Sequence, residues 1–302
     1  MADAISAQVD RSWSTISEVD YDAAGRLTLR YGDFCKSRGI PFQHEDHVRP
    51  YDTTTLFCPA GMQQFKARFK DPGYRGTEAN IQACLRLSDL DEIGDGSHLL
   101  NFDMLGLFSF REMSLADAVD FWFDFLAEIG VAPDVVTLHP DRLDDWRRLY
   151  AGRPVEIRAD DGCVWSDGDI GGYCTEFYRD GVEIGNIVNT NGDCIDVGFG
   201  LDRLAACLGE PPVGDVEALE RAVLKIIASG YRPGAKQQGY VLRKLLREVV
   251  RRGGRVDHPV FHEERARQAR LQARYERLRT KHPGKPPEWW FDTHGIDPRD
   301  FD

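Results

Sequence analysis

The chain has 302 residues, 42% of them hydrophobic, which is enough to bury the core of one large domain and a smaller one, so a globular enzyme is the expected class. Seven cysteines without a C-x-x-C pair argue against a zinc ribbon or a disulfide framework, and the lack of a signal peptide or an apolar run of about 20 residues predicts a cytoplasmic protein without a membrane span. The net charge of −12 is uneven, since residues 1–220 hold 19 Lys and Arg against 40 Asp and Glu, whereas residues 221–285 hold 18 against 5.

The N-terminal part is expected to be extended, with one short helix. Residues 21–38 read as a strand that runs into a turn, and Gly39-Ile-Pro41 closes this turn. Residues 56–69 mix apolar and polar side chains around a Pro-Ala-Gly sequence. This mixture predicts a strand or a loop that leads into a short helix from Met62.

The middle of the chain is expected to be a helix followed by an antiparallel sheet. Apolar residues recur at helical spacing over 116–129, and Gly130 is a good stop signal, so this segment predicts a helix. Over 155–197, short β-prone runs are separated by turn residues. Asp180-Gly181 and Asn191-Gly192 lie between such runs, and these dipeptides favour hairpin turns because both central residues need a positive φ.

The C-terminal part is expected to be helical. After a linker at 209–214, apolar residues at helical spacing predict helices over 216–229 and 240–252, and the charged run 261–280 predicts a third. The residues from 283 onward are rich in Pro and predict a tail without regular structure. Three aromatic side chains of this tail are expected to dock on the body of the protein: Trp289, Trp290 and Phe291.

Residues 221–285 form a basic arm. A strip dense in Arg concentrates polyanions such as RNA or a phosphopantetheine-type cofactor. The alternative is a solvated, Arg-rich helical face that needs no ligand. His258 and His262 lie in this arm with a proline between them and no cysteine after them, so the pair is interpreted as incidental and no zinc is expected in the protein.

Four segments carry more information by their order than any one of them carries alone: DTTTLFCPAGMQQFK (52–66), CLR (84–86), NFDMLG (101–106) and DVGFGLDR (196–203). They resemble the three signature motifs of a class II aminoacyl-tRNA synthetase, and specifically those of the alanyl-tRNA synthetase family. Residues 238–247 resemble the helix that opens the tRNA-recognition region of that family. The resemblance implies an α+β fold, with an antiparallel sheet flanked by helices and a C-terminal helical domain.

The resemblance also implies a nucleotide site that needs little covalent chemistry. Activation is an attack by a carboxylate on the α-phosphate of ATP, in which positioning and charge neutralisation do most of the catalysis. Arg86 matches the arginine on the α-phosphate, and its planar fork suits that task. Phe102 and Met104 fall where the family binds ATP, with the Phe102 ring on the adenine. Arg203 matches the arginine that covers the other face of the base.

The amino-acid site implied by the resemblance is small. Asp196 matches the aspartate that binds the α-ammonium group, and Gly198 leaves room for a small substrate. Trp165 and Val188 match the walls of the pocket. ATP and Mg²⁺ are the implied cofactors, with the metal ligands left unassigned. Three of these residues also have an ordinary alternative: a surface position for Arg86, a core position for Phe102, and an ion pair with an arginine for Asp196.

A glycine-rich segment, residues 168–176, resembles the one that precedes the central hairpin of the family, although its glycines are equally typical of turns. Asp169 and Glu176 within it are interpreted as polar groups of the pocket, without assignment to Mg²⁺.

The chain departs from the family at three places. The loop after Arg86 is short and contains no lysine, and Leu107 and Arg111 replace an asparagine and a glycine. Ala235 stands where the family has an asparagine that reads the acceptor stem, and alanine has no side-chain hydrogen bond for a base. The expected acceptor contacts are Lys236, Arg243 and Arg247.

The sequence therefore predicts ATP-dependent activation of a small amino acid, L-alanine first, and its transfer to an acceptor, tRNA first. The alternative acceptors are a small-molecule amine and a carrier protein in a specialised biosynthetic pathway. Two further alternatives are an inactive synthetase-like protein that binds an amino acid or RNA, and a structural partner of a larger synthetase. The expected organisation is a short stand-alone chain without editing and C-terminal domains: a catalytic domain (1–208), a basic helical domain (209–282) and a tail (283–302).

Overall fold

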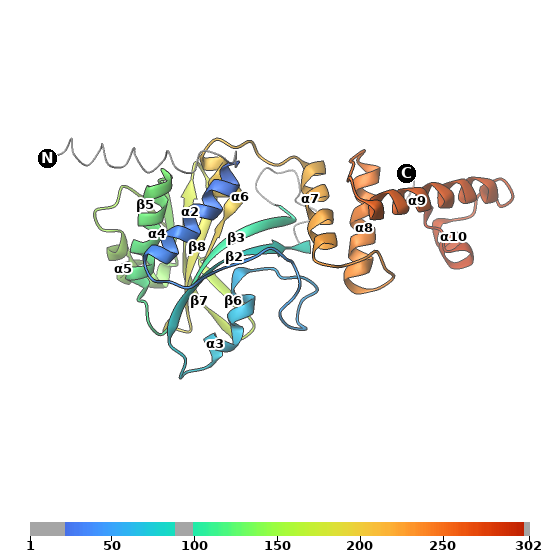
Figure 1. The fold of residues 1–302 in the computed structure, drawn as a ribbon. Helices are drawn as coiled ribbons and strands as arrows, with labels where there is room; N and C mark the ends of the chain where they lie inside the picture. Colours follow the sequence, from blue (N-terminus) through green and yellow to red (C-terminus); the bar gives the residue numbers. More distant parts are fainter. Residues whose placement is uncertain (1–21, 88–98, 299–302) are drawn as a thin grey trace.

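The computed structural model describes residues 22–87 and 99–298, and it centres on one mixed sheet with helices packed against it (Figure 1). The expected α+β class is confirmed. The nine strands run in the order β1-β2-β3-β9-β8-β7-β4-β5, with β6 beside β7. Their bounds are β1 Phe42–Glu45, β2 Gly76–Leu85, β3 Asn101–Phe110, β4 Val135–Leu138, β5 Glu156–Ala159, β6 Val164–Asp167, β7 Ile170–Arg179, β8 Val182–Thr190 and β9 Cys194–Gly200.

The centre of the sheet is antiparallel, as expected, while its two edges are parallel. Strand β1 pairs with β2 and strand β4 pairs with β5 in parallel, and the remaining pairs are antiparallel. The two predicted hairpins join β7 to β8 and β8 to β9. Asp180 and Asn191 adopt φ values of 50° and 54°, and the glycines that follow them also have positive φ. The turn sequences therefore fix the order of the three strands at the centre of the site.

Two helices cover one face of the sheet, α2 (Ala23–Ser37) and α4 (Leu115–Ile129). The Tyr31 hydroxyl of α2 donates to the Gly106 carbonyl (2.8 Å), and the Trp122 ring of α4 stacks on Phe199 with the ring centroids 4.0 Å apart. Helix α4 begins at a capping box formed by Ser114 and Asp117, and it ends at a left-handed glycine. The main hydrophobic core lies between these helices and the sheet.

The prediction of a strand over residues 21–38 is wrong, because these residues form α2. Leu27, Leu29 and Tyr31 alternate with other residues in the sequence, as they would in a strand. Leu29 is 42% exposed, however, and does not lie on the buried face of the helix. The buried side chains of Ala23, Leu27, Tyr31 and Phe34 follow the helical repeat instead. The Asp22 carboxylate accepts a hydrogen bond from the Gly25 amide, which caps the N-terminus of the helix.

The other helices continue along the chain. Their bounds are α3 Lys66–Lys70, preceded by a 3-10 turn at Gly61–Phe65, α5 Leu143–Trp146, α6 Leu201–Cys207, α7 Asp215–Ala228, α8 Gln237–Arg251, α9 Pro259–Arg279 and α10 Pro287–His294; short 3-10 turns at Pro140–Arg142 and Arg147–Tyr150 flank α5. The predictions of a short helix near Met62, of a helix over 116–129 and of the three C-terminal helices are confirmed. In the described ranges, no helix combines the length and the apolar character needed to cross a bilayer.

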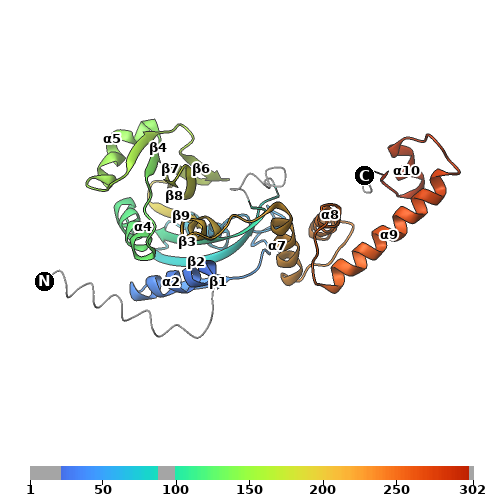
Figure 2. The ribbon, with the colours of Figure 1, turned by 90° about the horizontal axis from the view of Figure 1, so that it is seen from above.

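The C-terminal helices extend away from the end of the sheet. Leu219 of α7 and Leu245 of α8 share a core cluster with Leu85 of β2, so these helices are joined to the sheet by apolar packing. Helix α9, about 30 Å long at 1.5 Å per residue, projects outward with α10 folded back along it (Figure 2).

The prediction of an irregular tail docked on the body is also wrong. Residues 287–294 form α10, and the Trp290 ring packs edge-on against Tyr275 of α9, 5.0 Å between centroids. Trp290 is buried while Phe291 is exposed. The tail therefore folds on the basic arm, because one buried tryptophan and a helix N-terminus at Pro287 are enough to order it there.

Candidate functional site

A cavity of about 250 Å³ opens on the face of the sheet opposite α2 and α4. Strand alternation creates this division, since successive side chains point to opposite faces. Leu105 and Leu107 of β3 lie in the main core, and Phe102 and Met104 line the cavity. On β9, Val197 lies in the core, whereas Asp196 and Gly198 on either side of it line the cavity. The same strands thus build the core with one set of side chains and the site with the other.

All eight residues that the resemblance assigned to ATP and to the amino acid line this one cavity: Arg86, Phe102, Met104, Trp165, Val188, Asp196, Gly198 and Arg203. They come from β3, β6, β8, β9, α6 and, for Arg86, the position directly after β2, and they are spread over almost 120 residues. Asp169 and Glu176 do not line the cavity. The lysine-free loop after Arg86 falls largely within residues 88–98, outside the described residues.

Arg86 and Phe102 lie together at one end of the cavity. The Arg86 Nε donates a hydrogen bond to the Pro59 carbonyl (2.9 Å), which fixes the plane of the guanidinium. Its Cζ lies 4.9 Å from the centroid of the Phe102 ring, a distance typical of a cation–π contact. Phe102 is half-buried and is not part of a core cluster. A cationic fork and an aromatic face are therefore available side by side for an anionic, planar ligand.

Arg203, in the first turn of α6, is held by a residue that sequence reasoning missed. Its guanidinium donates to the backbone carbonyl of Glu183 (2.8 Å) and to the Glu183 carboxylate (3.1 Å). Glu183 and Asp202 also line the cavity, and Asp202 forms an ion pair with Arg221 (3.1 Å). No sequence motif joins Glu183 to Arg203; the pairing of β8 with β9, which α6 directly follows, brings them together.

Asp196 lies at the other end of the cavity and is almost enclosed, with 7% of its surface exposed. Burial, and secondly the negative charge of Asp167, raise the pKa of its carboxyl group to about 7. Next to it on the same face, a Cβ at Gly198 would lie only 2.8 Å from the Met104 sulfur. The site therefore has a desolvated carboxylate, and next to it a floor formed by Gly198 and Met104 that leaves little space for a substrate side chain.

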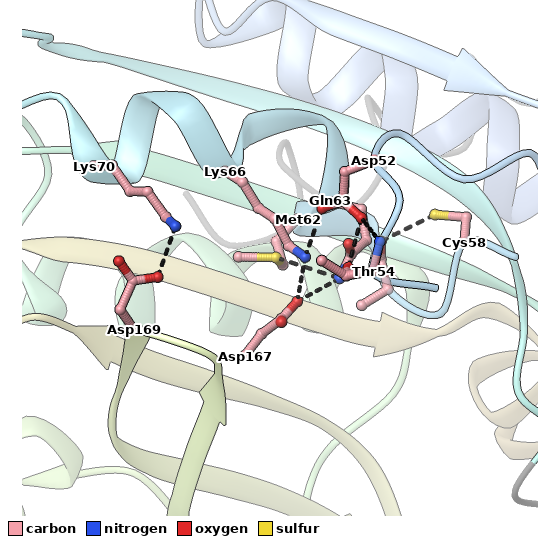
Figure 3. Close-up of polar contacts among 10 residues, drawn as sticks. Asp52, Thr54, Cys58, Met62, Gln63, Lys66, Lys70, Asp167 and Asp169 are labelled. Atoms are coloured by element: carbon pink, nitrogen blue, oxygen red, sulfur yellow. Dashed lines mark hydrogen bonds and ion pairs between the residues drawn. The ribbon is translucent and has the colours of Figure 1, made fainter. Parts of the chain in front are cut away.

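A polar network beside Asp196 was also missed from the sequence. The Lys66 ammonium lies 3.1 Å from an Asp52 oxygen and 2.9 Å from an Asp167 oxygen, and Gln63 donates to Asp167 (2.6 Å). Figure 3 shows Lys66 reaching from α3 to the β6 carboxylate. Hydrogen bonds from Thr54 and the charge of Lys66 lower the pKa of Asp52 to about 2. The network ties the loop before α3 to the hairpin that carries Trp165.

The three expected acceptor residues do not line the cavity. Lys236 is the N-cap residue of α8, and the other two lie on that helix. Arg243 borders a separate groove between α8 and α9, where its guanidinium lies 3.9 Å from the buried Glu264 carboxylate. Arg247 hydrogen bonds to the Arg243 carbonyl (3.4 Å). These residues belong to a second surface, on the basic arm.

Two positions where the chain departs from the alanyl-tRNA synthetase pattern have structural roles. Leu107 is buried in the main core. Arg111 has a φ of 56°, and its guanidinium donates to the carbonyls of Phe69 and Asp71 (3.0 Å each). Both substitutions support the sheet rather than the cavity.

Known proteins of one family are similar to this chain. Residues 29–179 match the family model for tRNA synthetases class II (A). Among curated proteins, the alanine–tRNA ligase of Tropheryma whipplei (strain Twist) is 28% identical over 298 residues, covering 74% of this chain and 34% of that protein. The alanine–tRNA ligase of Francisella philomiragia is 29% identical over 309 residues, covering 76% and 36%. The chain spans about a third of the length of these relatives.

The solved structures that match this chain are more distant in sequence. The pyrrolysyl-tRNA synthetase from Desulfitobacterium hafniense has 14% identity and a TM-score of 0.39, with 66% of this chain and 74% of that chain covered. The apo histidyl-tRNA synthetase of S. aureus has 11% identity and a TM-score of 0.42, with 61% and 66% covered.

Proposed function

Since this chain belongs to the class II (A) tRNA synthetase family, we propose that it activates a small amino acid, L-alanine first, with ATP and transfers it to tRNA. One observation carries the proposal: two guanidinium groups and one buried carboxylate line the same cavity. They are those of Arg86, Arg203 and Asp196. Such a site can bind an anionic nucleotide and an ammonium group next to one another. We further propose that residues 1–208 perform activation and residues 209–282 contact the acceptor.

ATP fits the end of the cavity that holds Arg86 and Phe102. Arginine binds phosphate oxygens with two parallel hydrogen bonds, and an aromatic ring stacks on a base. Arg203, oriented by Glu183, supplies a second positive charge. When Mg²⁺ is bound with the nucleotide, it neutralises charge on the phosphates. Glu183 and Asp202 are the carboxylates of the cavity wall that would supply the oxygen ligands this ion prefers.

The other end of the cavity fits the ammonium group and the side chain of a small amino acid. The Asp196 carboxylate is desolvated, so an ion pair with an ammonium group would be strong there. The narrow floor at Gly198 and the side chains of Trp165 and Val188 support a preference for a substrate as small as alanine. With the carboxylate of the amino acid held near Arg86, the enzyme would need no covalent catalyst.

The basic arm supports tRNA as the acceptor. Lys236 caps α8 while Arg243 and Arg247 lie on it, all in the segment where positive charge is concentrated. One observation favours the second candidate, transfer to a small-molecule amine or a carrier protein: Ala235 has no side-chain group that could read a base pair.

Amino-acid-dependent exchange of labelled pyrophosphate into ATP tests the activation step. We expect Arg86→Ala and Asp196→Ala each to abolish exchange. Arg158→Ala changes an exposed arginine of β5 that forms an ion pair with Glu156, so it serves as the matched control and is expected to leave exchange unchanged. Full exchange in both cavity variants would overturn the residue assignments.

A further inference from the structure

A second set of chemically reactive side chains lies outside the cavity. Cys163, Cys174 and Glu176 each offer one ligand atom, and these atoms all lie within 4.8 Å of one another. Both thiols are buried and Glu176 is half-buried. None of the three lines the proposed ATP and amino-acid cavity, so the catalytic proposal leaves them without a role.

The β6–β7 hairpin brings the three side chains together. The Cys174 amide donates to the Cys163 carbonyl (2.9 Å), directly beyond the pair formed by Val164 and Tyr173. Cys163 is therefore the cross-strand neighbour of Cys174. Glu176 is two residues further along β7 and points to the same face, because strand side chains alternate. The register of the hairpin thus sets the spacing of both sulfurs.

Neighbouring hydroxyl groups orient two of the three candidate ligands, Cys163 and Glu176. The Cys163 thiol lies 3.0 Å from the Thr137 hydroxyl, which in turn donates to the Glu176 carboxylate (3.3 Å). The Tyr178 hydroxyl donates to the same carboxylate oxygen, Oε2 (2.8 Å). Within the described part of the chain, the other oxygen, Oε1, accepts no hydrogen bond and remains available.

The chemistry of this donor set matches a thiophilic divalent cation. Two thiolates and one carboxylate are ligands that zinc accepts in a tetrahedral site, and three protein ligands leave one position for water. Bonds of about 2.0 to 2.3 Å place tetrahedral ligand atoms about 3.5 to 3.8 Å apart. The three ligand atoms already lie within 4.8 Å of one another, so side-chain rotations are enough to bring them to these distances. Binding releases both thiol protons to solvent.

We propose that Cys163, Cys174 and Glu176 bind a zinc ion or a similar thiophilic divalent cation. The ion lies behind the wall of the amino-acid pocket, since the two cysteines share a core cluster with Val188, and Trp165 packs against it. In the sheet register, Cys174 pairs with Val188 and Val188 pairs with Asp196. Two strand spacings, about 10 Å, therefore separate the cluster from Asp196. Bound metal would fix the hairpin that carries Trp165.

Titration of the reduced, chelator-treated protein with Co²⁺ tests this site without any activity assay. We expect one equivalent to bind, with a sulfur-to-cobalt charge-transfer band and the strong visible absorption of a tetrahedral ion, both removed by Zn²⁺. Cys163→Ser and Cys174→Ser should each lose most of the charge-transfer band. Glu176→Gln should raise the Kd at least about tenfold, because even groups outside the ligand shell contribute about 10- to 100-fold.

Cys207→Ser is the matched control, because this thiol is exposed on α6 and is not part of the cluster; its titration should equal that of the unchanged protein. A wild-type protein that shows no charge-transfer band overturns the proposal. So does a band that survives in both cysteine variants, or non-reducing peptide mapping that finds Cys163 and Cys174 joined as a disulfide in the isolated protein. Where a serine variant does not fold by circular dichroism, the Glu176→Gln titration decides.

Discussion

Val188 on β8 lies directly opposite Asp196 on β9 in the antiparallel register, so an apolar side chain borders the carboxylate at the closed end of the cavity. Paired residues of this kind have Cβ atoms about 5 Å apart. Val188 therefore contributes to the burial of the carboxylate, and this burial is the main reason for its raised pKa. The relationship connects the strand register to the electrostatics of the site.

Asp196→Asn is expected to stabilise the ligand-free protein at pH 8. The folded pKa of about 7 lies above the usual value of 3.8, so the folded state binds this proton more tightly than the unfolded state. The stability from this proton is complete below about pH 4 and is lost as the pH rises through 7. Urea unfolding should show a gain of up to about 4 kcal/mol at pH 8 that disappears near pH 4. A gain in stability that is the same at both pH values would contradict the raised pKa of Asp196.

Gly198→Ala is expected to weaken amino-acid binding without unfolding the protein. The new Cβ would lie 2.8 Å from the Met104 sulfur, so Met104 must move into the cavity. Overpacking of this kind costs about 1 to 3 kcal/mol, and we expect the KM for alanine in the exchange assay to rise about 5- to 150-fold. Gly214→Ala is the control, because a Cβ there meets nothing within 4 Å. Equal KM values for the two variants would show that the cavity floor is not the substrate site.

Lys66→Met is expected to destabilise the protein by about 1 to 3 kcal/mol, because it leaves two partly buried carboxylates without their cation. The pKa of Asp52 is lowered to about 2, so its stabilising contribution exists above its usual pKa of 3.8 and is lost as the pH falls toward 2. Urea unfolding should therefore show a difference at pH 7 that shrinks as the solution is acidified.

Lys70→Met provides the comparison for the same helix. Its ion pair with Asp169 is largely exposed, and such pairs contribute about 0 to 1 kcal/mol. Losses of equal size in the two variants would mean that the Lys66 network has no special role in joining α3 to β6.

Lys236→Ala and Arg247→Ala are expected to weaken RNA binding by the basic arm. Each lost phosphate contact should reduce the slope of log affinity against log salt concentration by about 1. A mobility shift with tRNA at several salt concentrations measures this slope. Arg158→Ala, on the opposite edge of the sheet, should leave it unchanged. An unaltered slope in both arm variants would favour a small molecule or a carrier protein as the acceptor.

The sequence predicted much of the fold because its strongest local signals agree with the packing. Helix α4 has a capping box, a periodic apolar face and a C-terminal glycine, and the two hairpins have their turn dipeptides. Helix α2 was misread because Leu29 suggested alternation where the burial is helical. Helix α10 was missed because its only buried anchor, Trp290, finds its partner on α9.

Motif order was enough to predict which residues line the cavity, while their roles in binding and catalysis stay predictions. The partners of these residues could not be predicted. Glu183 on β8 meets Arg203 on α6, and Asp167 on β6 meets Lys66 on α3, only in the folded structure. The same holds for Cys163 and Cys174, which are eleven positions apart and form no recognisable spacing motif. Local patterns indicate elements and motifs, whereas contacts between elements depend on the assembled sheet.

The most direct test of the account is pyrophosphate exchange measured with each of the common amino acids in turn. If Arg86, Arg203 and Asp196 form an activation site with a narrow floor, exchange will be strongest with alanine and will fall steeply for larger side chains. The central claim would be contradicted if none of the amino acids supported exchange, or if exchange were strongest with a bulky amino acid.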